Sequence, residues 1–115
     1  MLNTPFSPWP SYTQEEADAV SRVVLSNKVN YWTGIESREF EREFAEYCGT
    51  NYAITLANGT LALDLALNAL NIGGGDEVIV TPRTFLASAS SIVNSGAKPL
   101  FADVDRDSQN ITAET

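Results

Sequence analysis

The feature that most constrains the fold is a change of hydrophobic period near the middle of the chain. In the first part, apolar residues recur at helical intervals, whereas from residue 52 short β-type runs alternate with helical segments. The β-type runs cover residues 52–56, 77–81 and 98–102, and the helical segments between them cover residues 59–72 and 84–94. Strands and helices that alternate with tight connections predict parallel strand pairing. The expected fold class is therefore α/β, with a mostly parallel sheet in a three-layer sandwich.

The part before the sheet predicts an extended arm followed by two helices. Residues 3–12 contain several prolines and should be extended. Thr13, with Glu16 three residues later, has the spacing of a capping box, so a helix should begin there. A second helix should occupy residues 36–47, with Gly49 ending it. The later helix over residues 59–72 is apolar almost all round, which predicts burial, and three glycines should end it.

The composition excludes several functional classes. Fifteen acidic residues against seven basic ones give a formal net charge of -8, and no Lys or Arg cluster offers a nucleic-acid surface. Without histidine, the chain supplies no Ser-His-Asp relay, no His-ligated zinc and no imidazole base. Cys48 is the one cysteine, so no internal disulfide or multi-cysteine metal site is expected, as suits a reducing cytosol.

No segment predicts export or insertion into a membrane. The first ten residues lack a basic n-region and an apolar core, so they do not form a secretory signal. No apolar run approaches the ~18 residues needed to span a bilayer. We therefore expect a soluble, acidic, cytoplasmic protein with no metal site and no nucleic-acid or membrane partner.

The sharpest local motif is the turn Asn58-Gly59-Thr60, which leads from a predicted strand directly into a helix. Gly59 permits a positive φ angle and close approach of a ligand to the backbone. The helix start offers unpaired N–H groups, and Thr60 adds a hydroxyl. Together these groups predict a phosphate or carboxylate site. Taken alone, however, helix capping by Asn58 or Thr60 is the commoner explanation.

Two further groups of residues follow predicted strands. The turn over residues 81–86 lies at the carboxyl edge of the sheet, where open parallel sheets bind ligands. Phe85 there could stack on a planar cofactor ring or pack as a core residue, and Arg83 could pair with an anion or be solvated. Asp103 and Asp105 could hold a metal or transfer a proton, although carboxylates after a strand more often cap the next turn.

Several linked blocks occur in an order and spacing typical of one enzyme family. They are Trp32-Thr-Gly34 and the segments over residues 40–49, 57–70, 75–88 and 96–105. The blocks resemble the DegT/DnrJ/StrS-type sugar aminotransferases, which are pyridoxal-phosphate (PLP) enzymes of fold type I. The resemblance covers nearly the whole chain. It implies that residues 1–115 form an arm, two helices and the first β-α-β-α-β part of an incomplete PLP-binding large domain.

The resemblance also implies roles for individual residues. Gly59 and Thr60 match the segment that holds the cofactor phosphate through backbone N–H groups and a hydroxyl, and Phe85 matches the aromatic residue that stacks on the pyridine ring. The loop at the active-site entrance is matched by Trp32, Thr33 and Gly34, which are therefore expected to touch substrate.

The family reaction transfers an amino group, usually from glutamate, to a keto group of a nucleotide-linked sugar. The resemblance thus implies a cytosolic homodimer, with active sites at the subunit interface, that serves O-antigen, capsule or antibiotic sugar pathways. The partners it implies are a nucleotide-sugar substrate and an amino donor.

The chain departs from the family in lacking two catalytic groups. Neither Lys28 nor Lys98 matches the Schiff-base lysine motif, and neither Asp103 nor Asp105 matches the carboxylate that pairs with the pyridinium nitrogen. PLP chemistry needs both groups, so no catalytic residue is assigned and residues 1–115 alone are expected not to catalyse transamination. Thr112 resembles the N-cap of a helix that does not follow, so we expect the chain to be part of a longer protein.

A non-catalytic α/β binding or interaction module, paired with a separately encoded remainder, is the alternative function. A receiver-like signalling domain fits less well. Two predicted helices precede the first strand, and no lysine stands where such a site needs one.

Overall fold

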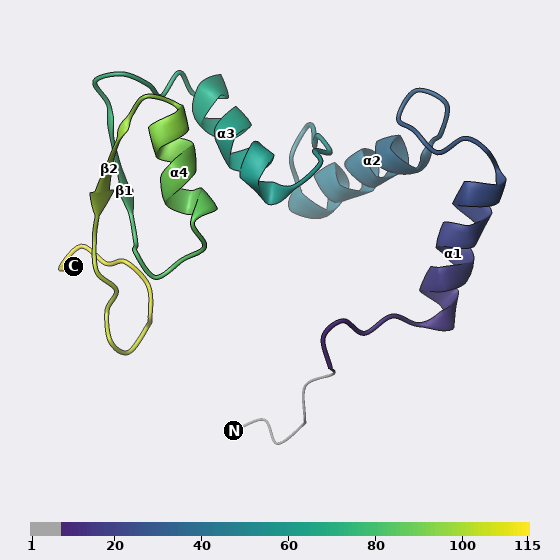
Figure 1. Cartoon of the computed structure of the whole chain (residues 1–115), viewed down its shortest axis with the longest axis horizontal. Helices are drawn as coiled ribbons and strands as arrows, with labels where there is room; N and C mark the ends of the chain where they lie inside the picture. Colours follow the sequence, from purple (N-terminus) through teal and green to yellow (C-terminus); the bar gives the residue numbers. More distant parts are fainter. Residues whose placement is uncertain (1–7) are drawn as a thin grey trace. The chain divides into compact units, whose positions relative to one another are not determined.

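The computed structural model describes residues 8–115, which divide into two compact units after Thr55 (Figure 1). The first unit contains helices α1 (Gln14–Leu25) and α2 (Glu36–Cys48). The second contains α3 (Gly59–Ala69), β1 (Glu77–Val80), α4 (Ala87–Asn94) and β2 (Lys98–Phe101). Residues 8–12 of the predicted arm form neither helix nor strand, and residues 3–7 of it lie outside the described part of the chain.

The capping box at the start of α1 is confirmed. The Thr13 backbone N–H donates to the Glu16 carboxylate at 2.6 Å, and the Glu16 N–H donates to Thr13 Oγ1 at 3.3 Å. The hydrogen bonds from the Thr13 backbone and hydroxyl stabilise the ionised carboxylate and so lower the pKa of Glu16. The first helix therefore begins where the sequence predicts.

Gly49 ends α2, also as predicted. It adopts the left-handed conformation with a φ of 67°, and its N–H donates to the Glu46 carbonyl at 3.1 Å. The Thr50 N–H donates to the Ala45 carbonyl at 3.0 Å, which satisfies a second carbonyl at the helix end. The helix extends one residue past the predicted range, to Cys48.

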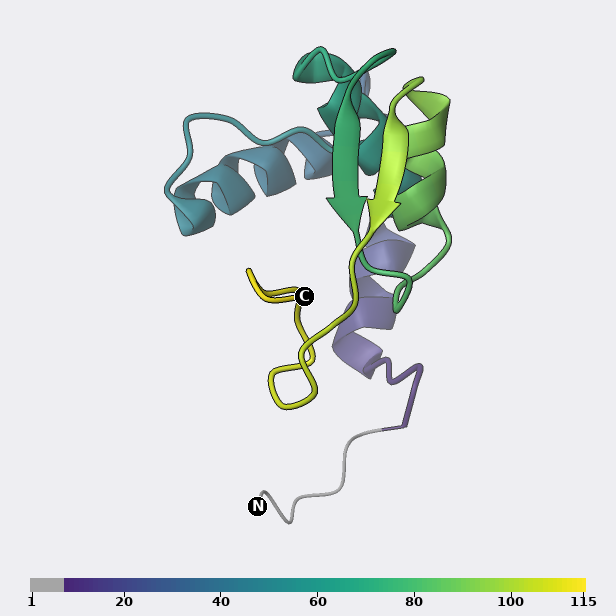
Figure 2. The ribbon, with the colours of Figure 1, turned by 90° about the vertical axis from the view of Figure 1, so that its left-hand side faces the viewer.

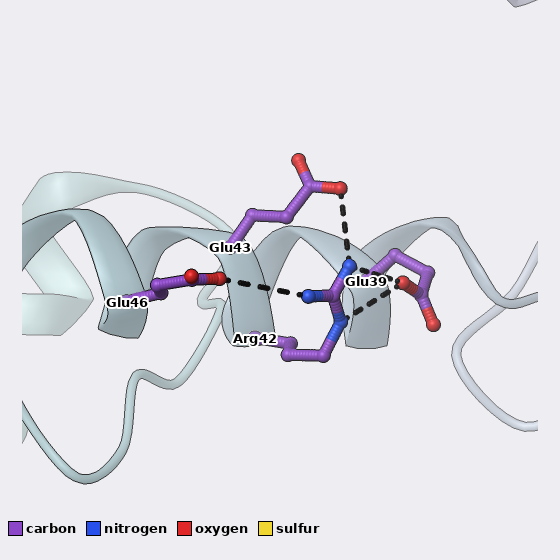
Figure 3. A network of polar contacts seen from close by, with 4 residues as sticks. All are labelled: Glu39, Arg42, Glu43 and Glu46. Atoms are coloured by element: carbon purple, nitrogen blue, oxygen red, sulfur yellow. Dashed lines mark hydrogen bonds and ion pairs between the residues drawn. The ribbon is translucent and has the colours of Figure 1, made fainter.

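The surface of α2 carries an aromatic row and a charged network. The Phe40 and Phe44 rings are stacked with centroids 5.5 Å apart, and Tyr47 continues the row 6.4 Å from Phe44. The charged network joins Arg42 to three glutamates, Glu39 at 2.9 Å, Glu43 at 3.4 Å and Glu46 at 3.8 Å (Figure 3). Because these side chains are exposed to water, the network contributes little to stability.

The second unit is built around two parallel strands. β1 and β2 pair in register from Glu77 opposite Lys98 to Val80 opposite Phe101, and α4 connects them. The Ala102 N–H donates to the Val80 carbonyl at 3.0 Å and extends the ladder by one bond. This parallel β-α-β arrangement confirms the predicted α/β class.

The first predicted strand, over residues 52–56, is wrong. In the described part of the chain these residues form no strand. A strand is held by ladder hydrogen bonds to a neighbouring strand, whereas the Thr55 N–H donates to the Glu41 carboxylate at 2.7 Å. The segment is therefore bound to a helix side chain instead of a sheet edge.

The end of α3 differs from the predicted end at residue 72 because the helix stops before the glycines. Asn71 adopts the left-handed conformation with a φ of 57°. Its N–H donates to the Asn68 carbonyl at 2.9 Å, and the Ile72 N–H donates to the Leu67 carbonyl at 2.9 Å. These two bonds form a Schellman motif, in which asparagine takes the position more often occupied by glycine.

The start of α4 is also later than predicted, at Ala87 instead of residue 84. The Arg83 N–H donates to Thr81 Oγ1 at 3.1 Å, which bends the chain into a turn after β1. The Ser88 N–H then donates to the Phe85 carbonyl at 3.0 Å. Because residues 81–86 form this turn, α4 begins about one helical turn later than predicted.

The core of the second unit lies between the sheet and its helices. Its buried residues are Val80, Ile92 and Ala97, with Leu67, Ile72 and Val78 packed against them. Both α3 and α4 lie behind the strands when the sheet is viewed face-on (Figure 2); α4 packs on both strands, and α3 packs on α4.

The other face of the sheet carries Ile79, which is 64% exposed. The predicted burial of α3 is not observed, because α3 packs on α4 along one side and none of its residues is buried.

Among residues 8–115, no helix has the length and apolar character to cross a membrane.

Candidate functional site

The start of α3 is capped by Asn58. Its backbone is extended, with φ and ψ of -167° and 169°, and its side-chain oxygen accepts a hydrogen bond from the Leu61 N–H at 3.0 Å. Of the two capping residues that the sequence allows, Asn58 therefore fills the role. Thr60 does not, and its hydroxyl makes no hydrogen bond to any residue of the described chain.

The same helix start leaves donors available for a ligand. The N–H groups of Gly59 and Thr60 have no partner among residues 8–115. A Cβ at Gly59 would meet no atom within 4 Å. Gly59 does not use the positive φ that glycine permits, because it is the first residue of α3. Its value lies in the open space beside its backbone, which suits the approach of an anion.

Phe85 lies at the same end of the unit as the start of α3. Figures 1 and 2 show that α3 and α4 run opposite to the strands, so both helix N-termini lie toward the end of the unit at which β1 and β2 end. Phe85 is 76% exposed, which excludes a core role within this unit. It lines an open pocket of about 340 Å³ with Pro82, Leu86 and Phe101.

Of the two carboxylates that follow β2, Asp105 stabilises a turn. Asp105 accepts hydrogen bonds from the Ser108 N–H at 2.6 Å and the Asp107 N–H at 3.0 Å. These bonds, that from Ser108 foremost, lower the pKa of Asp105. Asp103 accepts from the Val104 N–H at 2.8 Å. Turn capping is thus confirmed for Asp105, whereas Asp103 bonds only its neighbour in the chain. In residues 8–115 no group of three or more acidic, Cys or His side chains is arranged to hold a metal.

The predicted substrate loop belongs to the first unit and is organised by Asn30. The Asn30 side-chain oxygen accepts hydrogen bonds from the backbone N–H groups of Trp32 and Thr33, both at 3.0 Å, and from the Thr33 hydroxyl at 3.1 Å. The Gly34 N–H donates to the Asn30 carbonyl at 2.8 Å. One asparagine thus closes the loop with four accepted bonds.

The three residues predicted to contact substrate have different surroundings in this loop. The polar groups of Thr33 already bond within the loop. Gly34 is required by space, because a Cβ there would lie 2.4 Å from the Lys28 carbonyl oxygen. Trp32 is 86% exposed, so it alone of the three presents a large free side chain. Contact of this loop with substrate remains a prediction.

Glu41 accepts three hydrogen bonds that could not be predicted from the sequence. Its Oε1 accepts from the Thr55 N–H at 2.7 Å and the Thr55 hydroxyl at 2.8 Å, while its Oε2 accepts from the Tyr31 hydroxyl at 3.1 Å. The bonds from Thr55 foremost lower the pKa of Glu41, and the bond to Glu41 raises the pKa of Tyr31. Thr55 lies 14 positions from Glu41, so no local pattern could have predicted the contact.

Comparison with known proteins identifies close relatives. The profile of the DegT/DnrJ/EryC1/StrS aminotransferase family matches residues 10–115. The chain is 42% identical over 108 residues to the L-glutamine:2-deoxy-scyllo-inosose aminotransferase of Streptomyces kanamyceticus, covering 90% of this chain and 25% of the relative. It is 52% identical over 75 residues to the GDP-perosamine synthase of Caulobacter vibrioides, covering 65% of this chain and 20% of that protein.

Solved structures agree with this grouping. The aminotransferase from Psychrobacter cryohalolentis has 71% sequence identity and a TM-score of 0.89, over 96% of this chain and 28% of that one. Solved relatives include PLP and PMP forms. The chain spans about a quarter of the length of the Streptomyces kanamyceticus relative, and its fold is part of the fold of type I PLP-dependent aminotransferases. The chain therefore belongs to the DegT/DnrJ/EryC1/StrS family of PLP-dependent aminotransferases.

Proposed function

We propose that this chain is the N-terminal part of a PLP-dependent aminotransferase that aminates a keto group on a nucleotide-linked sugar. The observation that carries the proposal is the open start of α3, where Gly59 and Thr60 offer free N–H groups beside unoccupied space. Family membership supports amino transfer. The similarity to a GDP-perosamine synthase supports a nucleotide-linked substrate.

The start of α3 has the donor set that a phosphate needs. The two free N–H groups lie at the positive end of the helix dipole, and the Thr60 hydroxyl adds a third donor. These groups would hold the phosphate of PLP, and the exposed Phe85 ring at the same end would stack on the pyridine ring. When bound, PLP supplies an electron sink for the transfer of the amino group.

Substrate recognition is assigned to the loop around Trp32. Its exposed indole offers a large flat surface, which suits stacking on a base or a sugar face. Thr33 and Gly34 act by giving the loop its shape, since their polar groups are already bonded to Asn30. Glutamate is the proposed amino donor. The proposed setting is a cytoplasmic homodimer that serves polysaccharide or cell-surface sugar biosynthesis, including O-antigen.

Residues 1–115 alone are proposed to be catalytically incompetent, because neither Lys28 nor Lys98 matches the cofactor-anchoring lysine motif. The chain would then supply only the phosphate site and the stacking ring. A non-catalytic module is the alternative, and it is favoured only by this mismatch and by the chain's coverage of a quarter of its relative. A borohydride-reducible covalent adduct of PLP with the isolated chain would contradict the proposal of incompetence.

The phosphate site is tested with Thr60→Ala and Thr60→Ser in the product of the complete reading frame. Thr60→Ala removes the hydroxyl donor and should weaken PLP binding about tenfold, whereas Thr60→Ser keeps the donor and should bind nearly as the unsubstituted protein does. Equilibrium dialysis gives the dissociation constants. Thermal unfolding should stay unchanged, since the hydroxyl bonds no residue of the described chain. Equal PLP affinity in all three proteins would overturn the assignment.

A further inference from the structure

Glu41, on α2, joins the segments that precede and follow this helix, through Tyr31 and Thr55. Both of its carboxylate oxygens are used, one by the N–H and hydroxyl of Thr55 and the other by the hydroxyl of Tyr31. The residue is half-buried, and its bonds to Thr55 are partly shielded from water, whereas its bond to Tyr31 is exposed. An ionised carboxylate is the side chain that can accept all three donors at once. The low pKa of Glu41 keeps it ionised, which argues against a role as a proton donor.

Tyr31, in turn, is fixed from two further sides. The guanidinium carbon of Arg38 lies 6.0 Å from the centre of the Tyr31 ring, and Arg38 also donates to the Gly34 carbonyl at 2.6 Å. The Trp32 ring meets Tyr31 edge-to-face, with centroids 5.7 Å apart and planes at 85°. The orientation of the exposed Trp32 ring therefore depends on the position of Tyr31.

We propose that Glu41 is a positioning residue that, through the Tyr31 hydroxyl, holds Trp32 in the orientation used for substrate. The proposal rests on the proposed function, because it takes Trp32 to contact the nucleotide-linked sugar. Glu41 itself touches neither substrate nor cofactor in this scheme. Its contribution is to reduce the number of loop conformations that binding must select.

The test uses the product of the complete reading frame, loaded with PLP, and three variants. Tyr31→Phe removes one hydroxyl and leaves the bonds from Thr55 in place, while Glu41→Gln replaces the shared acceptor by an amide. Thr55→Val is the matched control, because it removes a hydroxyl from the other carboxylate oxygen without touching Tyr31. The readouts are KM for the nucleotide sugar, kcat, the PLP absorbance spectrum and hydrogen exchange of the peptide spanning residues 28–35.

Tyr31→Phe and Glu41→Gln should raise KM for the sugar about threefold to tenfold, with kcat within about twofold and an unchanged PLP spectrum. The double variant should be no worse than the poorer single variant, because both act through the same bond. Hydrogen exchange should rise in residues 28–35 and stay constant elsewhere. Thr55→Val should leave KM unchanged.

Two results would overturn the proposal. The first is faster exchange throughout the protein with loss of PLP, which indicates a purely structural role. The second is an unchanged KM in Tyr31→Phe. If the unsubstituted protein binds PLP but aminates no nucleotide sugar, the proposed function fails by itself. The exchange measurement then decides the role of Glu41, because constant exchange of residues 28–35 in Tyr31→Phe contradicts it.

Discussion

At the level of single residues, Gly34 and Gly59 are glycines for opposite reasons. A Cβ at Gly34 would lie 2.4 Å from the Lys28 carbonyl oxygen and 3.0 Å from the Asn30 carbonyl oxygen. Both atoms belong to the backbone of a closed loop, so neither can move aside without breaking the loop. At Gly59 the backbone is helical and the space is open, so the protein itself tolerates a methyl group there, and only the proposed phosphate ligand would exclude it.

Gly34→Ala should lower the free energy of unfolding by about 1–3 kcal/mol, the usual cost of forcing a methyl group into filled space. Gly59→Ala is the matched control, and should change the free energy of unfolding by less than about 0.5 kcal/mol. It should instead weaken PLP binding, because the methyl group occupies the approach to the backbone. Urea denaturation measures the first effect and dialysis the second. Equal destabilisation by the two substitutions would contradict the contrast.

At the level of elements, the sequence located those boundaries that depend on neighbouring residues. The capping pair of Thr13 and Glu16 and the left-handed Gly49 both act within a few positions of the chain, and both are confirmed. The predicted end of α3 failed because Asn71 took the left-handed position before the glycines. The predicted strand over residues 52–56 failed because its Thr55 bonds a glutamate 14 positions away.

In the candidate site, too, some features could be predicted from the sequence and others could not. The turn with Phe85 lies at the carboxyl end of β1, as the alternation of strands and helices predicts. The start of α3 lies toward the same end although the strand expected before it does not form, because α3 packs on α4. The sequence allowed either Asn58 or Thr60 as the N-cap of α3, and the structure shows Asn58 in this role. The contact of Glu41 with Tyr31 and Thr55 could not be predicted, because it depends on how a loop folds back on α2.

The start of α1 should respond to acid through Glu16. Its folded pKa is lowered, so the ionised carboxylate stabilises the helix start fully at pH values above the unfolded pKa. That contribution declines as the pH falls below this value and is lost once the pH passes the folded pKa. Amide NMR shifts of Thr13 and Glu16 should report the transition, and Glu16→Gln should abolish it.

Glu15→Gln is the matched control for this titration. Glu15 lies in the same first turn, but its carboxylate accepts no hydrogen bond from residues 8–115. The variant should therefore keep the acid transition of the Thr13 and Glu16 amides. Loss of the transition in Glu15→Gln would show that general charge in the first turn is responsible, and not the capping box.

At the level of the whole molecule, apolar side chains are exposed in both compact units. Phe40 and Val24 are exposed in the first unit, and Ile79, Phe101 and Leu70 in the second. Exposed apolar patches of this kind mark surfaces that other protein surfaces cover. The relatives that the chain matches are about four times as long, which fits a chain that normally packs against further sequence.

The 115-residue chain expressed by itself should therefore bind 8-anilinonaphthalene-1-sulfonate and self-associate. The product of the complete reading frame should do neither to the same extent at equal concentration. Dye fluorescence and sedimentation velocity measure the two properties. If the 115-residue chain is monomeric and does not bind the dye, its exposed apolar side chains do not need to be covered by another protein surface.

If the start of α3 holds the PLP phosphate as proposed, its cap has a consequence for the rate of PLP binding. Because the Asn58 side chain already fixes the first turn, the donors of Gly59 and Thr60 are arranged before any anion arrives. Association then requires desolvation and entry but no coil-to-helix transition of this segment. The on-rate at this end of the site should accordingly be governed by access and charge, with little dependence on denaturant concentrations too low to unfold α3.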